Sequence, residues 1–188
     1  GVATNWTTAP STLAVSSGKY YCEAKAQHTS LMVGILDIDQ MVTNNFQGTK
    51  SNGWGYEVTG TLWNNGGATT SWGATYTTGD IIGIAMDLDN NKLYFSKNGT
   101  YINSGDPTSG ATGTGAVSVT VPSTFASGNY FPAFGDNNVD SETFEINFGN
   151  PTFIISSGNT DANGYGNFEY AVPSGYYSLN TKNLAEFG

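Results

Sequence analysis

Pairs of acidic residues are the first side chains in this sequence that could do chemistry. Asp37 and Asp39, like Asp87 and Asp89, are two positions apart and would share one face of an extended segment. Paired carboxylates can bind Ca²⁺ or flank a glycosidic bond during hydrolysis. The stretch DNNVDSE (136–142) also offers oxygen ligands, but it lacks the regular spacing of a calcium-binding loop. Glycoside hydrolysis is therefore the least supported function, and no metal site is expected.

The single histidine and the single cysteine do not complete a catalytic set. His28 follows a predicted strand and has no partner motif, which indicates a surface turn. Cys22 falls on the apolar side of that strand, so we expect a buried and inert thiol. Catalysis requires a nucleophile with a base, a carboxylate pair in a cleft, or a metal. The sequence therefore predicts no enzyme and no cofactor.

Two tryptophans raise the possibility of carbohydrate binding. Trp63 precedes Asn64-Asn65-Gly66, and Trp72 lies between Ser71 and Gly73, so both are flanked by residues typical of exposed turns. An indole can stack on the C–H face of a sugar while its N–H forms hydrogen bonds. Packing in the core is the alternative, and it is favoured for both residues.

Alternating apolar residues indicate the strands that would position these side chains. In KYYCEAKA (19–26), the small and aromatic residues Tyr20, Cys22, Ala24 and Ala26 would share one face. The lysines, Tyr21 and Glu23 would take the other face. This pattern predicts a half-buried strand.

A hairpin is predicted in the middle of the chain. Residues 82–88 and 93–95 alternate around Asn90-Asn91, and asparagine tolerates the positive φ of a tight two-residue turn. Residues 144–148 form a third clear strand, and weaker patterns predict strands at 31–36, 54–58, 61–63, 117–121 and 130–134. Since no window has helical periodicity, the fold class is all-β, with two packed antiparallel sheets and no substantial helix. The polar stretches 39–52 and 103–128 are expected to be long loops.

Composition limits the partners. The chain has 188 residues, which favours one domain spanning 1–188, and 15 acidic residues against 6 lysines and no arginine give a net charge of -9. This balance disfavours nucleic acid and anionic membranes, and no apolar run is long enough for membrane insertion. The chain begins at Gly1 rather than Met, which is consistent with a processed product, a trimmed chain or a segment of a longer protein.

Six sequence blocks in order resemble the SPRY domain. GDIIGIAMDLDNNKLYFSKNGT (79–100) is similar to its central signature, and the other blocks are SSGKYYCEAKA (16–26), MVGI (32–35), GWGYEVTGTLWNNG (53–66), NYFPAFGDN (129–137) and FEINFGNPTF (144–153). The resemblance covers a core of about 16–153. It implies a bent, concanavalin-like (lectin-like) β-sandwich without a catalytic residue set.

The resemblance also implies a binding rim. SPRY domains bind peptides or proteins through loops at one rim, which by position would include Trp6 and Pro10, the long loop around Phe46, and the turn formed by Asp136, Asn137 and Asn138. The alternative is that these are solvated turns. The resemblance further implies that Trp54 belongs to the core and that Asp87 and Asp89 frame the hairpin turn. Family members usually have an apolar segment before the position of Ser16, so a missing upstream strand is plausible.

The end of the chain suggests a subgroup. FEYAVPSGYYSLNTKNLAEFG (168–188), within an extension of about 154–188, resembles the tails of SPRY-like modules in phage and marine viral structural proteins. The expected function is therefore a virion structural, appendage or decoration module, located in a virion or outside the cell, whose rim binds a protein or glycan for host attachment or assembly. Other virion proteins are expected partners. The alternative is a carbohydrate-binding module or lectin of a secreted protein. Sequons at Asn5 and Asn98 would matter only in a eukaryotic secretory route.

Overall fold

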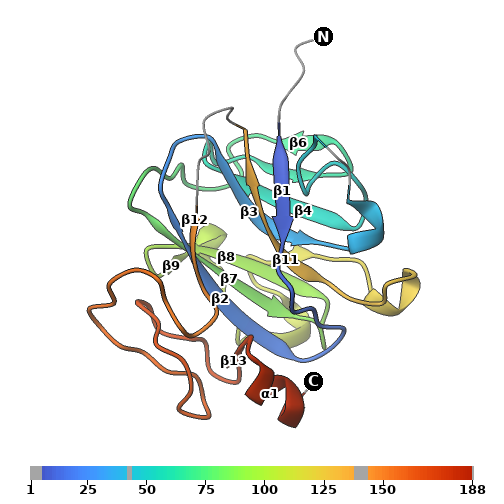
Figure 1. Cartoon of the computed structure of the whole chain (residues 1–188). Helices are drawn as coiled ribbons and strands as arrows, with labels where there is room; N and C mark the ends of the chain where they lie inside the picture. Colours follow the sequence, from blue (N-terminus) through green and yellow to red (C-terminus); the bar gives the residue numbers. More distant parts are fainter. Residues whose placement is uncertain (1–5, 42–43, 138–143, 188) are drawn as a thin grey trace.

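Two β-sheets pack face to face in the computed structural model, which describes residues 6–41, 44–137 and 144–187 (Figure 1). The first sheet has the order β1 (Thr7–Pro10), β11 (Phe131–Asp136), β3 (Leu31–Leu36), β4 (Gly53–Glu57), β5 (Leu62–Asn64) and β6 (Gly67–Thr69). The second has the order β10 (Val117–Ser118), β8 (Lys92–Lys97), β7 (Ile81–Asp87), β2 (Lys19–Ala26) and β12 (Phe144–Asn147), with β9 (Thr100–Tyr101) beside β8 and β13 (Tyr177–Ser178) parallel to β2.

Helical segments are short in the described residues. They are η1 (Ile38–Gln40), η2 (Ile102–Ser104), η3 (Gly110–Thr112), η4 (Pro122–Thr124) and α1 (Thr181–Phe187). The predicted all-β sandwich without substantial helix is confirmed. None of the helices described is long and apolar enough to cross a membrane.

The core between the sheets consists of the side chains that alternation predicted. Cys22 pairs with Ile84, Ile84 pairs with Phe95, and all three are buried. Val33 and Tyr56 enter the same core from the first sheet. Trp54 also belongs to this cluster, as the family resemblance implied. Apolar burial of this kind stabilises a fold by about 25 cal/mol per Å².

The predicted hairpin joins β7 and β8, but its turn is longer than expected. Asp87 pairs with Lys92, so four residues connect the strands instead of two, and Asn91 has the positive φ of 55°. The Asp87 carboxylate accepts hydrogen bonds from the backbone and side chain of Asn90, and it pairs with Lys19 at 3.1 Å. Asp89 accepts a hydrogen bond from the Gly18 N–H at 2.8 Å. Both aspartates thus serve the turn.

Several short elements escaped the alternation pattern. β1 lies in the segment assigned to a rim loop, and the strand predicted at 117–121 is limited to β10. β6, β9, β13 and α1 were not predicted either. Strands of two to four residues are too short to show a period of two, and the seven residues of α1 span only about two helical turns, so the sequence alone did not indicate these elements.

The prediction that β2 is half-buried is wrong, because the C-terminal segment covers its outer face. Tyr21 packs edge-on against Phe168 with ring centroids 5.3 Å apart, and Tyr176 joins the same second cluster. Glu23 is fully buried, and its carboxylate accepts hydrogen bonds from the N–H groups of Glu169 (3.1 Å) and Tyr170 (2.9 Å). The side chains of Tyr21 and Asn147 donate two more.

A second buried carboxylate organises the C-terminal segment itself. One oxygen of Asp161 accepts hydrogen bonds from the N–H groups of Asn163 and Tyr165, both at 2.9 Å. Its other oxygen accepts from the N–H and hydroxyl of Ser178 and from the amide of Asn183. These bonds join the loop after Asn159 to β13 and α1. Residues 159–183 are therefore an ordered cover over the second sheet.

Candidate functional site

Three aromatic rings from distant parts of the chain meet on the outer face of the first sheet. Trp6 precedes β1, Phe46 lies in the connection between η1 and β4, and Trp63 belongs to β5. Ring centroids are 5.5 Å apart for Trp6 and Phe46 and 5.0 Å apart for Phe46 and Trp63, both in edge-to-face geometry. Such pairs contribute about 0.5–1.5 kcal/mol beyond their burial. We call these three residues the rim cluster.

The loop that carries Phe46 is held flat against the sheet. The buried Gln47 side chain donates hydrogen bonds to the carbonyls of Met32 (3.0 Å) and Ala133 (3.3 Å). The Thr8 hydroxyl donates to the carbonyl of Asn45 at 2.8 Å. A Cβ at Gly48 would lie 2.4 Å from the Cβ of Trp63, so this approach requires glycine. The position of Phe46 is therefore fixed by packing and by hydrogen bonds.

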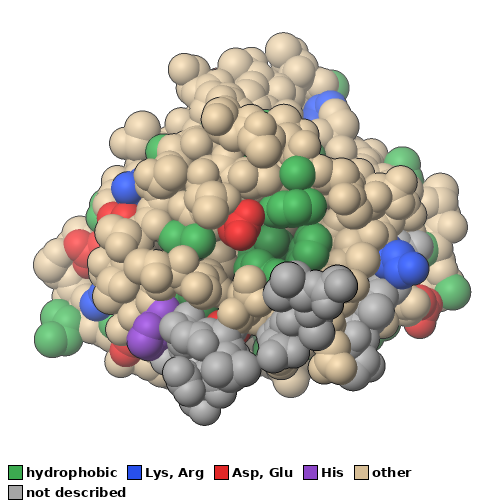
Figure 2. Space-filling model, turned by 90° about the horizontal axis from the view of Figure 1, so that it is seen from above, with side chains coloured by type: hydrophobic (Ala, Val, Ile, Leu, Met, Phe, Trp, Pro, Cys, Tyr) green, Lys and Arg blue, Asp and Glu red, His purple; other side chains and the backbone are tan. Residues whose placement is uncertain are grey.

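The three rings differ in exposure. Trp6 is only 5% exposed, whereas Phe46 and Trp63 are partly exposed. The Trp63 indole N–H donates to the Glu57 carboxylate at 2.9 Å. Trp6 therefore supports the cluster from below, while Phe46 and Trp63 face solvent beside a carboxylate. Figure 2, which looks down on the end where β1 begins, shows that most of this surface is uncharged, with a few acidic and basic side chains and a small apolar patch.

Asp136 lies apart from the rim cluster. It ends β11 and pairs with Thr7, next to Trp6 in the chain. Its side chain lines a hollow of about 270 Å³ with Phe134, Phe144 and Ile146. Because Phe134 points into the core between the sheets, Asp136 lies on the inner side of β11, away from the outer face that carries the cluster.

The remaining residues of the predicted rim are scattered. Asn137 is exposed, and its N–H donates to the carbonyl of Ser30 at 3.0 Å. Pro10 is at the opposite end of β1 from Trp6. Asn138 lies outside the described residues. The structure thus brings together Trp6, Phe46 and Trp63, and it separates them from Asp136.

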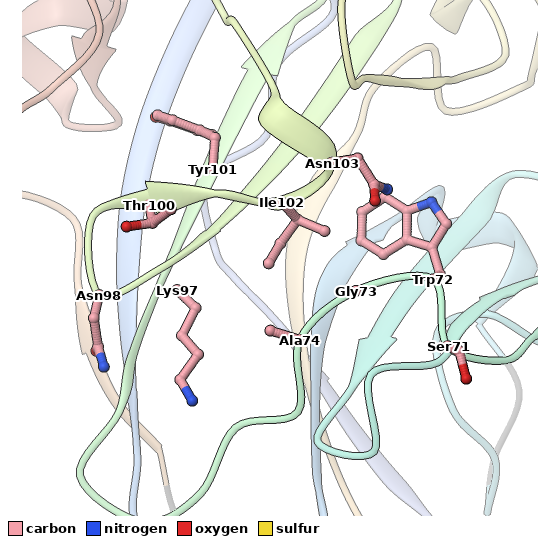
Figure 3. Close-up of a pocket in the computed structure, with 10 residues that line it drawn as sticks. All are labelled: Ser71, Trp72, Gly73, Ala74, Lys97, Asn98, Thr100, Tyr101, Ile102 and Asn103. Atoms are coloured by element: carbon pink, nitrogen blue, oxygen red, sulfur yellow. The ribbon is translucent and has the colours of Figure 1, made fainter.

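A pocket lies between the loop after β6 and the β8–β9 hairpin. Its volume is about 550 Å³, and Figure 3 shows the lining residues Ser71, Trp72, Gly73, Ala74, Lys97, Asn98, Thr100, Tyr101, Ile102 and Asn103. We call it the Trp72 pocket. The Trp72 ring forms edge-to-face pairs with Tyr56 (5.5 Å) and Phe95 (5.9 Å), so Trp72 packs partly against the core and also lines the pocket.

The charged groups near this pocket neutralise one another. Lys97 pairs with Asp80 at 3.1 Å and donates to the carbonyl of Thr75 at 2.8 Å. Burial opposes ionisation of Asp80, but hydrogen bonds from Asn98, the Thr77 N–H and Lys97 outweigh it and lower the pKa of that carboxyl. Burial and the nearby Asp80 raise the pKa of the Tyr56 phenol beneath Trp72 to about 12.

Sequence reasoning missed most of this pocket. It singled out Trp72 and the sequon at Asn98, but not Lys97, Tyr101 or Ile102, which come from the hairpin and η2. The sequon residue Asn98 forms the hairpin turn, where its side chain bonds the Ile81 N–H at 2.9 Å and Asp80 at 2.7 Å. The Asn-Gly turn in the central block was the available signal, because it predicts where the chain reverses beside Trp72.

Comparison with known proteins identifies the family. The SPRY domain model matches residues 19–151. The chain belongs to the SPRY family. The SPRY domain of human HERC1 is a structural neighbour with a TM-score of 0.58 and 20% sequence identity, covering 76% of this chain and 82% of that chain. At this identity the likeness shows the fold alone. Among the curated proteins, none matches the chain.

SPRY domains are generally non-catalytic protein-interaction modules, and the candidate chemical groups of this SPRY domain have structural contacts. Asp37 is buried and accepts hydrogen bonds from the Asp39 N–H (3.1 Å) and the Ser127 hydroxyl (2.6 Å). Cys22 is buried, which raises the pKa of its thiol. His28 is exposed in the bend after β2, as predicted. Within the described residues, no three His, Cys, Asp or Glu side chains are grouped to hold a metal.

Proposed function

We propose that this SPRY domain is a non-catalytic recognition module that binds a protein through the rim cluster, as a structural or appendage part of a virion. The family supports the binding role. The viral setting, and with it a virion or extracellular location, is supported by the resemblance of the 168–188 tail and by the absence of arginine. The buried bonds of Glu23 and Asp161 support a single domain that includes the extension.

The observation that carries the binding role is the fixed pair of partly exposed rings, Phe46 and Trp63, above the buried Trp6. Binding hot spots are enriched in aromatic residues that need no reordering to bind. Glu57 beside Trp63 and a net charge of -9 favour a partner that presents a basic side chain next to an apolar one. A protein is favoured over a glycan here because the Trp63 N–H is already engaged.

A crosslinking experiment tests the rim cluster. A photoreactive phenylalanine analogue is placed at Phe46, or at the control position Ile154, which is 92% exposed. Each labelled chain is produced in the natural source, and illumination of the assembly isolated from it should link one discrete protein to position 46 and none to position 154. Phe46→Ala should then weaken binding of that protein by about tenfold or more, as expected for a hot spot. Equal crosslinking from both positions, or unchanged affinity, would refute the assignment.

The virion setting has its own test. Native mass spectrometry of the protein from its natural source should find it in a large multi-chain assembly. A free monomer near 19.8 kDa would overturn the virion setting without affecting the assignment of the rim cluster.

A further inference from the structure

We propose that the Trp72 pocket binds a neutral saccharide of one or two rings, at a site separate from the rim cluster. Its volume of about 550 Å³ lies within the range of small-molecule sites. Its walls combine one indole with short polar side chains, as Figure 3 shows. That combination suits a ligand whose surface alternates between C–H faces and hydroxyl groups.

Trp72 is a preorganised stacking surface. Its edge-to-face contacts with Tyr56 and Phe95 are inclined at 72° and 88°, which fixes the plane of the indole. A Cβ at Gly73 would lie 2.8 Å from the Ile102 side chain, so the chain runs close against the pocket floor. A ring held in this way loses little conformational freedom when a sugar stacks on it.

Hydrogen-bonding groups without protein partners line the pocket. In the described structure, the hydroxyls of Ser71 and Thr100, the amide of Asn103 and the indole N–H of Trp72 make no hydrogen bond to the protein. Hydroxyl and amide groups both donate and accept, as sugar hydroxyls require. These four groups are therefore available to a ligand.

The backbone around the pocket adopts conformations that side chains rarely take. Ser71, Asn98 and Asn103 have φ values of 54°, 47° and 55°, and Ser104 follows at 53°. Left-handed non-glycine residues cost about 1 kcal/mol or more each and cluster at ligand sites. Ser71 and Asn103 are both exposed and line the pocket from two different segments, the loop after β6 and η2.

The charge balance selects a neutral ligand. The Lys97 ammonium group is shared between Asp80 and the Thr75 carbonyl, so it is not free to pair with an acidic sugar. The lining residues include no carboxylate that could pair with an amino sugar. Both charged classes should therefore bind more weakly than the corresponding neutral sugar.

Titration of the intact chain tests the proposal. The probes are methyl glycosides of glucose, galactose, mannose and N-acetylglucosamine, with lactose, maltose and cellobiose, followed by saturation-transfer NMR and tryptophan fluorescence. At least one should saturate with a Kd on the order of 1 mM. Glucuronic acid and glucosamine serve as charged comparators. The absence of saturable binding by every neutral probe would overturn the proposal.

Variants locate the site. Trp72→Ala should weaken binding by about tenfold or more, which corresponds to about 1.4 kcal/mol. Since that change also removes core contacts, Asn103→Gly and Ser71→Gly provide a second test: both positions are exposed with positive φ, where glycine is well tolerated. Each should weaken binding severalfold while unfolding remains unchanged. Asn65→Gly, at an exposed position with φ of 52° that does not line the pocket, is the matched control and should leave saccharide binding intact. Unchanged affinity in both glycine variants would refute the site.

Discussion

The two faces of β2 are both buried, yet they are held by different interactions. On the inner face, Tyr20, Cys22 and Ala24 pack into the apolar core between the sheets. On the outer face, Tyr21 packs on Phe168, while Glu23 is bound by donors from the C-terminal segment. Apolar burial does not depend on direction, whereas a buried carboxylate is stable only when several donors point at it.

This difference determines how much stability is lost when a side chain on each face is substituted, and whether that loss depends on pH. Removing an inner side chain leaves a cavity, and the cost does not depend on pH. Removing an outer carboxylate leaves buried donors without an acceptor, and the cost changes with protonation. The comparison can therefore be tested with matched substitutions on the two faces.

The largest effect is expected on the inner face. Ile84 is fully buried between Cys22 and Phe95 on neighbouring strands, so Ile84→Ala should lower the free energy of unfolding by about 2–5 kcal/mol. Ile154→Ala is the control, since Ile154 is 92% exposed and should change stability by less than about 0.5 kcal/mol. Urea denaturation followed by tryptophan fluorescence measures both. Similar losses in the two variants would contradict the placement of Ile84 in the core.

The same contrast explains how much of the fold the sequence predicted. The inner face of the second sheet was predicted because its side chains alternate with a period of two, as Ile82, Ile84 and Met86 do in β7. The sandwich that encloses this face was predicted from the same pattern. The cover was not predicted, because Glu23 looks like a solvent-facing residue until its donors from residues 169 and 170 are known. Those donors are backbone groups, which leave no trace in side-chain patterns.

The rim shows a similar limit. The family resemblance placed Trp6 and Phe46 on the same rim, and the structure places their ring centroids 5.5 Å apart. It did not indicate that Asp136 would take the other side of the sheet, because that depends on strand register. Trp63 joined the cluster through the loop at Gly48, whose close approach no local pattern predicts.

The next largest effect is expected at Asp161. Asp161→Asn replaces one carboxylate oxygen with an NH₂ group, which cannot accept a hydrogen bond. Each oxygen accepts at least two hydrogen bonds, so either the Ser178 donors or the N–H groups of Asn163 and Tyr165 lose their acceptor. At neutral pH this should cost about 2–4 kcal/mol. Hydrogen exchange should show the C-terminal segment opening while β7 stays protected. Uniform loss of protection across both regions would argue against a separate cover.

The pH dependence of that loss has a defined sign. Burial opposes ionisation of Asp161, but bonds from Ser178, Tyr165 and Asn183 outweigh it and lower its pKa below the ordinary 3.8. The carboxylate therefore contributes stability above about pH 3.8, and this contribution is lost as the pH falls through the folded pKa. The difference between wild type and Asp161→Asn should shrink in acid. A difference that grows below pH 3.8 would contradict this sign.

Glu23 should show the opposite sign and a smaller effect. Burial raises its pKa above the ordinary 4.5, although bonds from Tyr170, Glu169, Asn147 and Tyr21 offset part of the shift. Its contribution is therefore greatest below pH 4.5 and declines as the pH rises through the folded pKa. Glu23→Gln should cost about 1–2 kcal/mol at neutral pH and more near pH 4. Urea denaturation across this range measures the trend, and a loss that increases with pH would contradict it.

The smallest difference is expected between two glycine variants, one of which lies where the β8–β9 hairpin contacts the C-terminal cover. Gly99 has φ of +79°, and a Cβ there would lie 2.6 Å from the Tyr170 ring. Gly79 has φ of +90° with no atom within 4 Å of its Cβ position, so Gly79→Ala measures the backbone cost alone, about 1–2 kcal/mol. Gly99→Ala should cost about 0.5–1 kcal/mol more, because the Tyr170 side chain must leave its rotamer. Urea denaturation measures the free energy of unfolding of both variants. Equal losses would mean that the Tyr170 side chain moves aside at no cost, so that the cover is held by Glu23 and Asp161 and not by its contact with the hairpin.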